Sequence, residues 1–210
     1  MRHTTLIGFI AAFFFSSTLV FAGEPVKLPA PRMEGGKPLL QALKERKTGR
    51  AFAPTPLPDQ LLSDLLWAAD GVNRPDGHRT APSAMNMQEI DIYVARADGL
   101  YLYDAVNNSL IREAESDIRA ATGQQDFVKG APVNLIYVAD EARMEKVGGA
   151  KAKYAAADTG FIAQNVYLFC ASEGLETVVR GWFDEQELGA AMKLRPAQKI
   201  ILTQTVGYPQ

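Results

Sequence analysis

The stretch Lys151–Glu173, KAKYAAADTGFIAQNVYLFCASE, decides the fold of this chain. After Tyr154, apolar residues fall on nearly every side of a 3.6-residue period, which predicts a long helix that is buried on all sides. Gly174 follows and predicts the end of the helix. In a chain of this length, such a helix is either wrapped by other helices or packed against a second copy of the chain.

The segments before this helix predict strands. Ile90, Ile92 and Val94 alternate with polar or aromatic residues, which indicates a strand with one buried face. Residues 97–99 predict a turn and residues 100–103 the partner strand. Residues 132–139 are nearly all apolar, which favours a central strand covered on both faces.

Short helices and strands are expected on either side of these elements. One helix begins near Leu39 and is expected to end at Gly49, and a second covers residues 61–69 and ends at Gly71. The remaining predicted elements are a short helix at 117–121, a strand at 177–179, a helix at 185–193 and a last strand at 199–206. Together they predict an α+β fold, with a mixed, mainly antiparallel sheet surrounded by helices around a long buried central helix.

The first residues have the pattern of a secretory signal peptide. Arg2 and His3 precede an apolar run from Leu6 to Phe15, and small residues lead to a cut after Ala22. The alternative is a single membrane anchor, but the run is shorter than the roughly 20 residues that span a bilayer. We expect a periplasmic or secreted protein that is not membrane-embedded after cleavage.

Three regions follow from this reading: a signal peptide at 1–22, an arm rich in Pro and Gly at 23–36, and one domain at 37–210. The chain has 22 basic and 24 acidic residues, so it lacks the basic excess of a nucleic-acid binder. Its single cysteine, Cys170, allows no intramolecular disulfide. Stability must therefore come from core burial or from a partner subunit.

Side chains for acid, base or nucleophilic catalysis are scarce. After signal cleavage one histidine remains, His78, and no cluster has the spacing of a metal site. Cys170 lies within the apolar helix, where an inert apolar role is expected. We therefore name no catalytic side chain and no metal ligand, and expect the chemistry to come from a bound cofactor.

Residues 46–50, Arg-Lys-Thr-Gly-Arg, place three cations and a hydroxyl at a predicted helix end. Two guanidinium groups four residues apart can converge on a phosphate, with Thr48 as a short donor. The alternative is a solvated basic helix terminus, which the helix dipole also favours.

Taken together, five segments resemble the nitroreductase family of FMN-dependent dimeric flavoenzymes, and they occur in the family's order. The first is similar to its Arg-x-Ser/Thr-x-Arg/Lys phosphate segment and the second to its Pro-Ser-Ser-x-Asn-x-Gln segment beside the flavin ring. The third matches its central helix, the fourth its segment at the reactive edge of the flavin, and the fifth its closing Gly-Tyr-Pro. The segments are 46–50, 82–88, 157–175, 179–184 and 207–209.

The resemblance implies FMN as cofactor, a homodimer with the pocket at its interface, and hydride transfer through flavin N5 to or from a small organic substrate. It implies that Arg46, Lys47, Thr48 and Arg50 hold the phosphate. It also implies that Pro82, Ser83, Ala84, Asn86 and Gln88 frame the ring, and that backbone N–H groups of Arg180 and Gly181 face N5 or O4.

Two departures from the family pattern stand out. Many members carry a basic residue after Gly-Tyr-Pro, whereas this chain ends at Gln210, so the phosphate would depend on Arg46, Arg50 and Lys47. Ala84 stands where Ser is common.

An envelope protein of the same fold that binds a flavin or other small ligand without catalysis is the alternative to an enzyme. Residues 99–104 followed by Leu110 resemble the branch that includes thiazoline and oxazoline dehydrogenases.

Overall fold

The computed structural model describes residues 24–210, so the predicted signal peptide lies outside the described residues. Its centre is a seven-stranded sheet of order β1-β4-β3-β2-β5-β7-β6. Every pairing between these strands is antiparallel. The strands are β1 Val26–Lys27, β2 Ile90–Arg96, β3 Gly99–Asp104, β4 Ser109–Ala114, β5 Val133–Asp140, β6 Glu176–Arg180 and β7 Gln198–Gly207.

Strand β5 is central, as its apolar sequence predicts. It lies between β2 and β7, and all eight of its residues are buried. Leu135 and Tyr137 point into the larger core, while Ile136 and Val138 point into a second core on the other face. Because side chains alternate between the faces of a strand, an apolar layer on both sides requires an uninterrupted apolar run.

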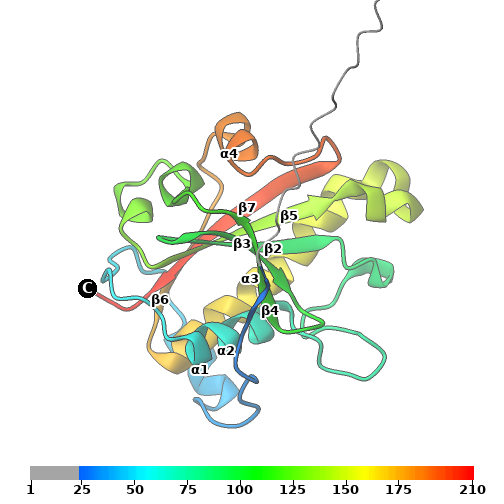
Figure 1. Ribbon diagram of the computed structural model, residues 1–210. Coiled ribbons are helices and arrows are strands. Elements are labelled where there is room, and N and C mark those ends of the chain that lie inside the picture. The colour runs from blue at the N-terminus through cyan, green and yellow to red at the C-terminus, as the bar shows by residue number, and fades with distance from the viewer. Residues whose placement is uncertain (1–23) are drawn as a thin grey trace, which may run out of the picture.

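Helices cover both faces of this sheet (Figure 1). Helices α1 Leu39–Glu45 and α2 Asp59–Asp70 pack against the long helix α3 on one face. Helix α4 Glu185–Ala191 lies on the other face, where Leu188 is fully buried in the second core. The predicted α+β fold is confirmed.

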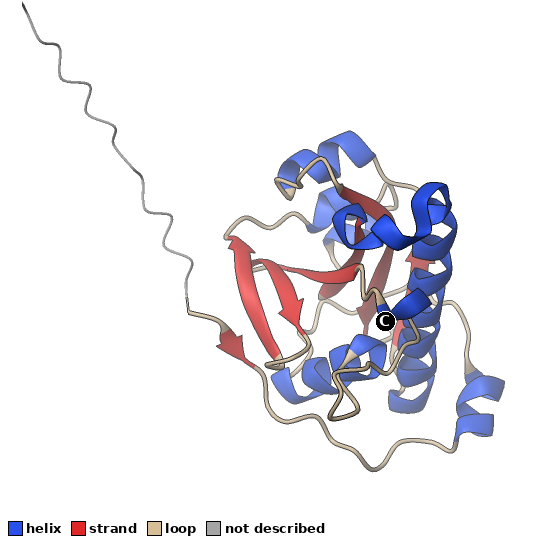
Figure 2. Cartoon of the chain, turned by 90° about the vertical axis from the view of Figure 1, so that its right-hand side faces the viewer, coloured by secondary structure: helices blue, strands red, loops and turns tan. Residues whose placement is uncertain are grey.

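Helix α3 spans Lys151–Glu173, the predicted range, and ends at Gly174, whose φ of 73° is left-handed. The long helix lies against the sheet (Figure 2). The prediction that it is buried on all sides is wrong within one chain. Its core side is buried, but an outer face is exposed, and this face consists of Ala156, Ala157, Gly160, Phe161 and Gln164.

Helix α1 ends earlier than predicted. Its last residue is Glu45, and the N–H of Arg46 closes the final turn on the carbonyl of Ala42 at 2.8 Å. The backbone of Arg46 then turns to ψ 121°, so residues 46–50 form an extended connection and Gly49 is no helix stop. Four 3-10 segments complete the described chain: Ala84–Asn86, Arg119–Thr122, Asp126–Lys129 and Glu141–Ala150. The second corresponds to the short helix predicted at 117–121, and the other three were not predicted.

The arm before α1 is packed along part of its length. Val26 and Lys27 pair with β4 at the edge of the sheet, and Leu28 is buried. Arg32 then forms an ion pair with Asp64 of α2 at 2.6 Å. No helix within residues 24–210 is both long and apolar enough to cross a membrane.

Candidate active site

The basic segment 46–50 is fixed against strand β6 by its glycine. The N–H of Gly49 donates to the carbonyl of Thr177 at 3.1 Å. A Cβ built on Gly49 would lie 1.3 Å from Oε2 of Glu176, so the close approach requires glycine here.

Tyr167 of α3 connects this segment to β6. Its hydroxyl accepts from the N–H of Val179 at 3.1 Å and lies 3.2 Å from Oγ1 of Thr48. The guanidinium carbon of Arg46 lies 5.4 Å from the centroid of the Tyr167 ring. Sequence reasoning had placed Tyr167 only in the apolar helix. A phenol hydroxyl on an apolar helix needs a polar partner, and this was the one feature of the sequence that could have marked Tyr167 as a site residue.

The cations of this segment differ in their partners. Lys47 forms an ion pair with Glu176 at 2.8 Å. Within residues 24–210, Arg46 and Arg50 have no carboxylate partner within 4 Å, and Arg50 is exposed. Two guanidinium groups without counter-ions, next to the Thr48 hydroxyl, form a donor set that suits a phosphate.

Segment 82–88 is held in a strained conformation over the first half of α3. The N–H of Ala84 donates to Asp158 at 2.8 Å, and Oγ of Ser83 accepts from the N–H of Gln88 at 2.8 Å. Met85, Asn86 and Gln88 have φ values of 51°, 52° and 48°. Three non-glycine residues in this region carry a conformational cost, and such clusters are typical of ligand-binding segments.

A pair of buried carboxyl groups supports this strained segment. Glu89 is fully buried and accepts from the hydroxyl of Ser83 at 3.2 Å. Burial raises the pKa of Glu89, and the nearby Asp158 raises it further. The Glu89 carboxyl therefore helps to hold the Ser83 side chain in place. Pro82 is exposed at the start of the segment.

The fourth predicted segment, 179–184, leaves β6 at Arg180 and Gly181. Gly181 is exposed, whereas the Arg180 side chain is only 4% exposed and donates to the carbonyl of Thr122 at 2.7 Å. The carbonyl of Trp182 accepts from the N–H of Gln124 at 3.0 Å, which fixes the chain beyond Gly181. The Arg180 guanidinium thus points into the protein, and only backbone groups remain at the surface.

Three segments contain the predicted cofactor-binding residues, and the structure brings two of them together within one chain. Segments 46–50 and 180–181 both lie at β6, connected through Tyr167. Segment 82–88 contacts Asp158, nine residues before Tyr167 on the same helix. At about 100° and 1.5 Å a residue, these two positions lie on roughly opposite sides of α3 and about 14 Å apart along it.

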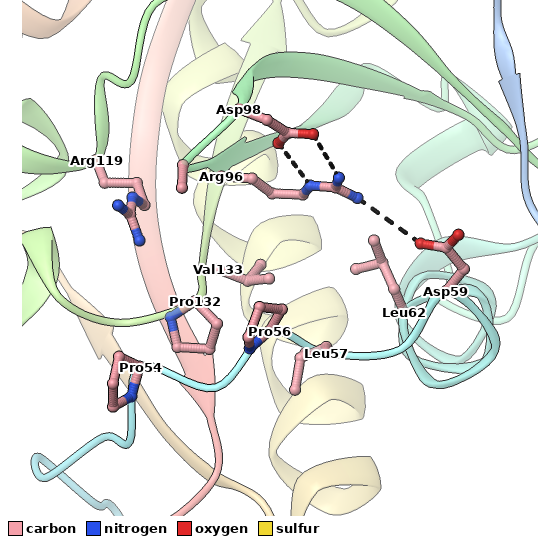
Figure 3. A pocket seen from close by; sticks show the side chains of 11 residues that line it. Pro54, Pro56, Leu57, Asp59, Leu62, Arg96, Asp98, Arg119, Pro132 and Val133 are labelled. Carbon is pink, nitrogen blue, oxygen red and sulfur yellow. Dashed lines mark hydrogen bonds and ion pairs between the residues drawn. The ribbon is translucent and has the colours of Figure 1, made fainter.

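A pocket of about 340 Å³ lies away from these segments (Figure 3). None of the predicted cofactor-binding residues lines it. Its two guanidinium groups are already engaged, Arg96 with Asp98 at 2.6 Å and Arg119 with Asp117 at 2.7 Å. It therefore offers no free charge to a ligand.

The other reactive side chains do not form a site. Within the described part of the chain, no three His, Cys, Asp or Glu residues could hold a metal ion. Cys170 is buried, and burial raises the pKa of its thiol far above the ordinary value, which disfavours a reactive thiolate. The His78 side chain lies 2.9 Å from the carboxylate of Asp76.

Comparison with known proteins identifies the family of the chain. The family model described as Nitroreductase family matches residues 43–208. A protein of Methanocaldococcus jannaschii that is named as a nitroreductase is 33% identical over 191 residues, which cover 86% of this chain and 96% of that protein.

Solved structures show the same fold. A crystal structure from Ralstonia eutropha JMP134, also named as a nitroreductase, is 44% identical, covers 90% of each chain and has a TM-score of 0.86. A structure from Desulfovibrio desulfuricans described as a complex with FMN is 23% identical, covers 82% of this chain and 87% of that chain, and has a TM-score of 0.61. The match of the family model over most of the chain, together with these relatives, shows that the chain belongs to the nitroreductase family.

Proposed function

We propose that this protein is an FMN-dependent oxidoreductase that transfers hydride or electrons to or from a small organic substrate. The observation that carries the proposal is the pair Arg46 and Arg50, which lack carboxylate partners among residues 24–210 and lie in the segment that packs against β6, on either side of Thr48. Membership of the nitroreductase family and the FMN complex of the D. desulfuricans relative support the choice of flavin.

The residues present fit FMN by the chemistry of their donors. Arg46 and Arg50 would hold the phosphate, with the Thr48 hydroxyl as an added donor, whereas Lys47 is neutralised by Glu176. The exposed backbone at Gly181 would present N–H groups to the ring, and Pro82 to Gln88 would frame it. When bound, the flavin supplies the hydride chemistry, so the chain itself needs to bind, orient and exclude water.

We propose further that each flavin lies between two copies of the chain. The phosphate segment and segment 82–88 contact opposite sides of α3, so one chain does not bring them to one ligand. The exposed face of α3 carries Phe161, which is 47% exposed, and α1 exposes Leu39, Leu40 and Leu43. Apolar patches of this kind mark interaction surfaces, and a homodimer would cover them.

The experiment that tests the cofactor is flavin retention. We would incubate the protein with FMN, desalt it and record the visible spectrum. Arg46→Ala with Arg50→Ala should abolish retention while cooperative unfolding persists, because the two guanidinium groups that would bind the phosphate are removed. The matched control is Lys27→Ala, which removes an exposed cation on β1, at the opposite edge of the sheet from β6, and should retain FMN.

The outcomes separate the possibilities. A retained flavin that dithionite bleaches and air restores supports the enzyme. Retention without turnover of any reductant or acceptor points to a ligand-binding protein of the same fold. Full retention by the Arg46/Arg50 double variant contradicts the phosphate assignment.

We also propose export to the periplasm or medium, on the pattern of residues 1–22 alone. The mature N-terminus of the protein purified from an envelope fraction should begin at Gly23. An intact N-terminus in the soluble cytoplasmic fraction would contradict this.

The likeness of residues 99–104 and Leu110 to the thiazoline and oxazoline dehydrogenase branch stays a prediction, to be tested with such substrates.

A further inference from the structure

A buried guanidinium at the end of β6 lacks a counter-ion. Arg180 is 4% exposed and donates to the carbonyl of Thr122 at 2.7 Å and to Oδ1 of Asn134 at 2.9 Å. Its guanidinium carbon lies 5.9 Å from the centroid of the Phe127 ring. Burial lowers the pKa of Arg180 to about 10, so the group stays charged at neutral pH.

Two partly buried arginines of the described chain are paired with carboxylates. Arg79 lies 2.6 Å from Asp70, and Arg119 lies 2.7 Å from Asp117. Arg180 has only neutral acceptors, and no carboxylate of residues 24–210 lies within 4 Å of it. An unpaired buried charge is costly, so its presence calls for an explanation beyond packing.

The surrounding chain leaves room for this charge. A Cβ built on Gly123 would lie 1.9 Å from Nη1 of Arg180, so the guanidinium occupies the space that a side chain at position 123 would need. Asn134 is oriented in turn by its own amide, which donates to the carbonyl of Val128 at 2.8 Å. The guanidinium is therefore held in one place by a buried polar network.

Its position relates it to the proposed cofactor site. Arg180 directly precedes the exposed Gly181, in the segment where backbone N–H groups would meet the flavin ring. The guanidinium is therefore one side-chain length from that backbone. Solvent screens a buried charge less than an exposed one, so the guanidinium can act over this distance.

We infer that Arg180 supplies a fixed positive charge that favours reduced over oxidised flavin at this site. This inference rests on the proposed function. Reduction by two electrons and one proton adds one negative charge to the site, which a nearby cation stabilises. In the test below, dithionite supplies the electrons and water the proton.

The experiment compares the midpoint potential of FMN bound to the full chain in the unaltered protein and in Arg180→Gln. The measurement is a dithionite titration against a reference dye. Loss of the charge should reduce the ratio of affinities for reduced and oxidised FMN at least tenfold, which lowers the potential by about 30 mV for a two-electron couple.

Three further variants make the result specific. Arg180→Lys keeps the charge and should keep the ratio within about threefold. The double variant Arg119→Gln/Asp117→Asn removes an ion pair with no net charge and should leave the ratio unchanged. Asn134→Asp places a carboxylate at the acceptor of Arg180 and should lower the potential even if Arg180→Gln does not fold.

An unchanged potential in folded Arg180→Gln would overturn the inference. So would an unchanged potential in Asn134→Asp, or an equal fall in Arg119→Gln/Asp117→Asn or in Arg180→Lys. Failure of the unaltered protein to bind FMN would overturn the proposed function and this inference together, and that result is recognisable before any variant is made.

Discussion

At the scale of single residues, the site depends on close contacts that leave little freedom. Gly49 packs against the Glu176 side chain, whose Cβ would lie 2.9 Å from an added Cβ. Tyr167 then connects Thr48 to Val179. These contacts determine where Arg46 and Arg50 point, although neither arginine is itself buried.

We predict that Gly49→Ala weakens FMN binding. The new methyl group must displace Glu176 or the segment itself, which moves the phosphate donors. The FMN dissociation constant, measured by fluorescence quenching, should rise about tenfold, which corresponds to about 1.4 kcal/mol. The control is Gly189→Ala on α4, where nothing lies within 4 Å and affinity should not change.

A second prediction at this scale concerns Asp70. Burial raises its pKa to about 7, from an ordinary 3.8, even though Arg79 lies 2.6 Å away and opposes the shift. Between these pH values, the folded chain holds a proton that the unfolded chain has released. The free energy of unfolding should therefore fall as pH rises from about 4 to about 7, by up to roughly 1.4 kcal/mol per unit.

Urea unfolding at pH 5 and pH 8 checks this prediction. Asp70→Asn should reduce the difference in unfolding free energy between the two pH values. Asp76→Asn, which alters an exposed carboxylate, should leave it unchanged. An undiminished difference in Asp70→Asn would assign the pH dependence to other groups, such as Glu89.

At the scale of elements, α3 has one face in the core and one face exposed on the surface of the described chain. Its inner face, with Ile162, Val166 and Cys170, is packed into the core. Its outer face of small residues and Phe161 has no partner in the described chain. A helix that is apolar on both faces can bury both of them only if another surface covers the outer face.

We predict that Phe161→Glu separates the proposed dimer. A carboxylate at the centre of an apolar interface would have to be desolvated without a partner. Sedimentation at micromolar concentration should change from dimer to monomer, with loss of flavin retention and little change in helix content. Glu187→Lys on α4 alters charge on the opposite side of the sheet and should remain a dimer. A dimeric Phe161→Glu variant would place the interface elsewhere.

At the scale of the whole molecule, the arrangement of the two binding segments requires a composite site. If each flavin takes its phosphate contacts from one copy and its ring contacts from the other, defects in different segments can complement each other. In a hybrid dimer, one site receives both defects and the other receives neither.

We predict that hybrids of Arg46→Ala/Arg50→Ala chains with Asn86→Ala/Gln88→Ala chains regain flavin. Each parent homodimer should lose FMN, and the hybrid, isolated through two different affinity tags, should retain one FMN per dimer. The FMN content of the parent homodimers and of the hybrid is measured by absorbance after desalting. A hybrid without flavin, from parents that fold and pair, would mean that one chain supplies both segments.

How far the fold could be predicted depends on the range of the interactions. The periodicities within α2, β2, β5 and α3 arise from neighbours a few residues apart, and these elements were identified with nearly correct bounds. The end of α1 was misplaced because Gly49 is held by a contact with Glu176, far along the chain. Strand β1 was missed because its two residues become a strand only by pairing with β4.

The sequence by itself determined the longer helices and strands, the central place of β5, the family and the candidate residues, because local pattern and motif order carry that information. Only the tertiary structure decided that α3 keeps an exposed face and that Tyr167 joins Thr48 to β6. It alone also placed segments 46–50 and 82–88 on opposite sides of α3, and the Arg180 guanidinium in a buried network without a counter-ion. Each of these depends on contacts between residues distant in sequence, whose geometry is set by how the elements pack.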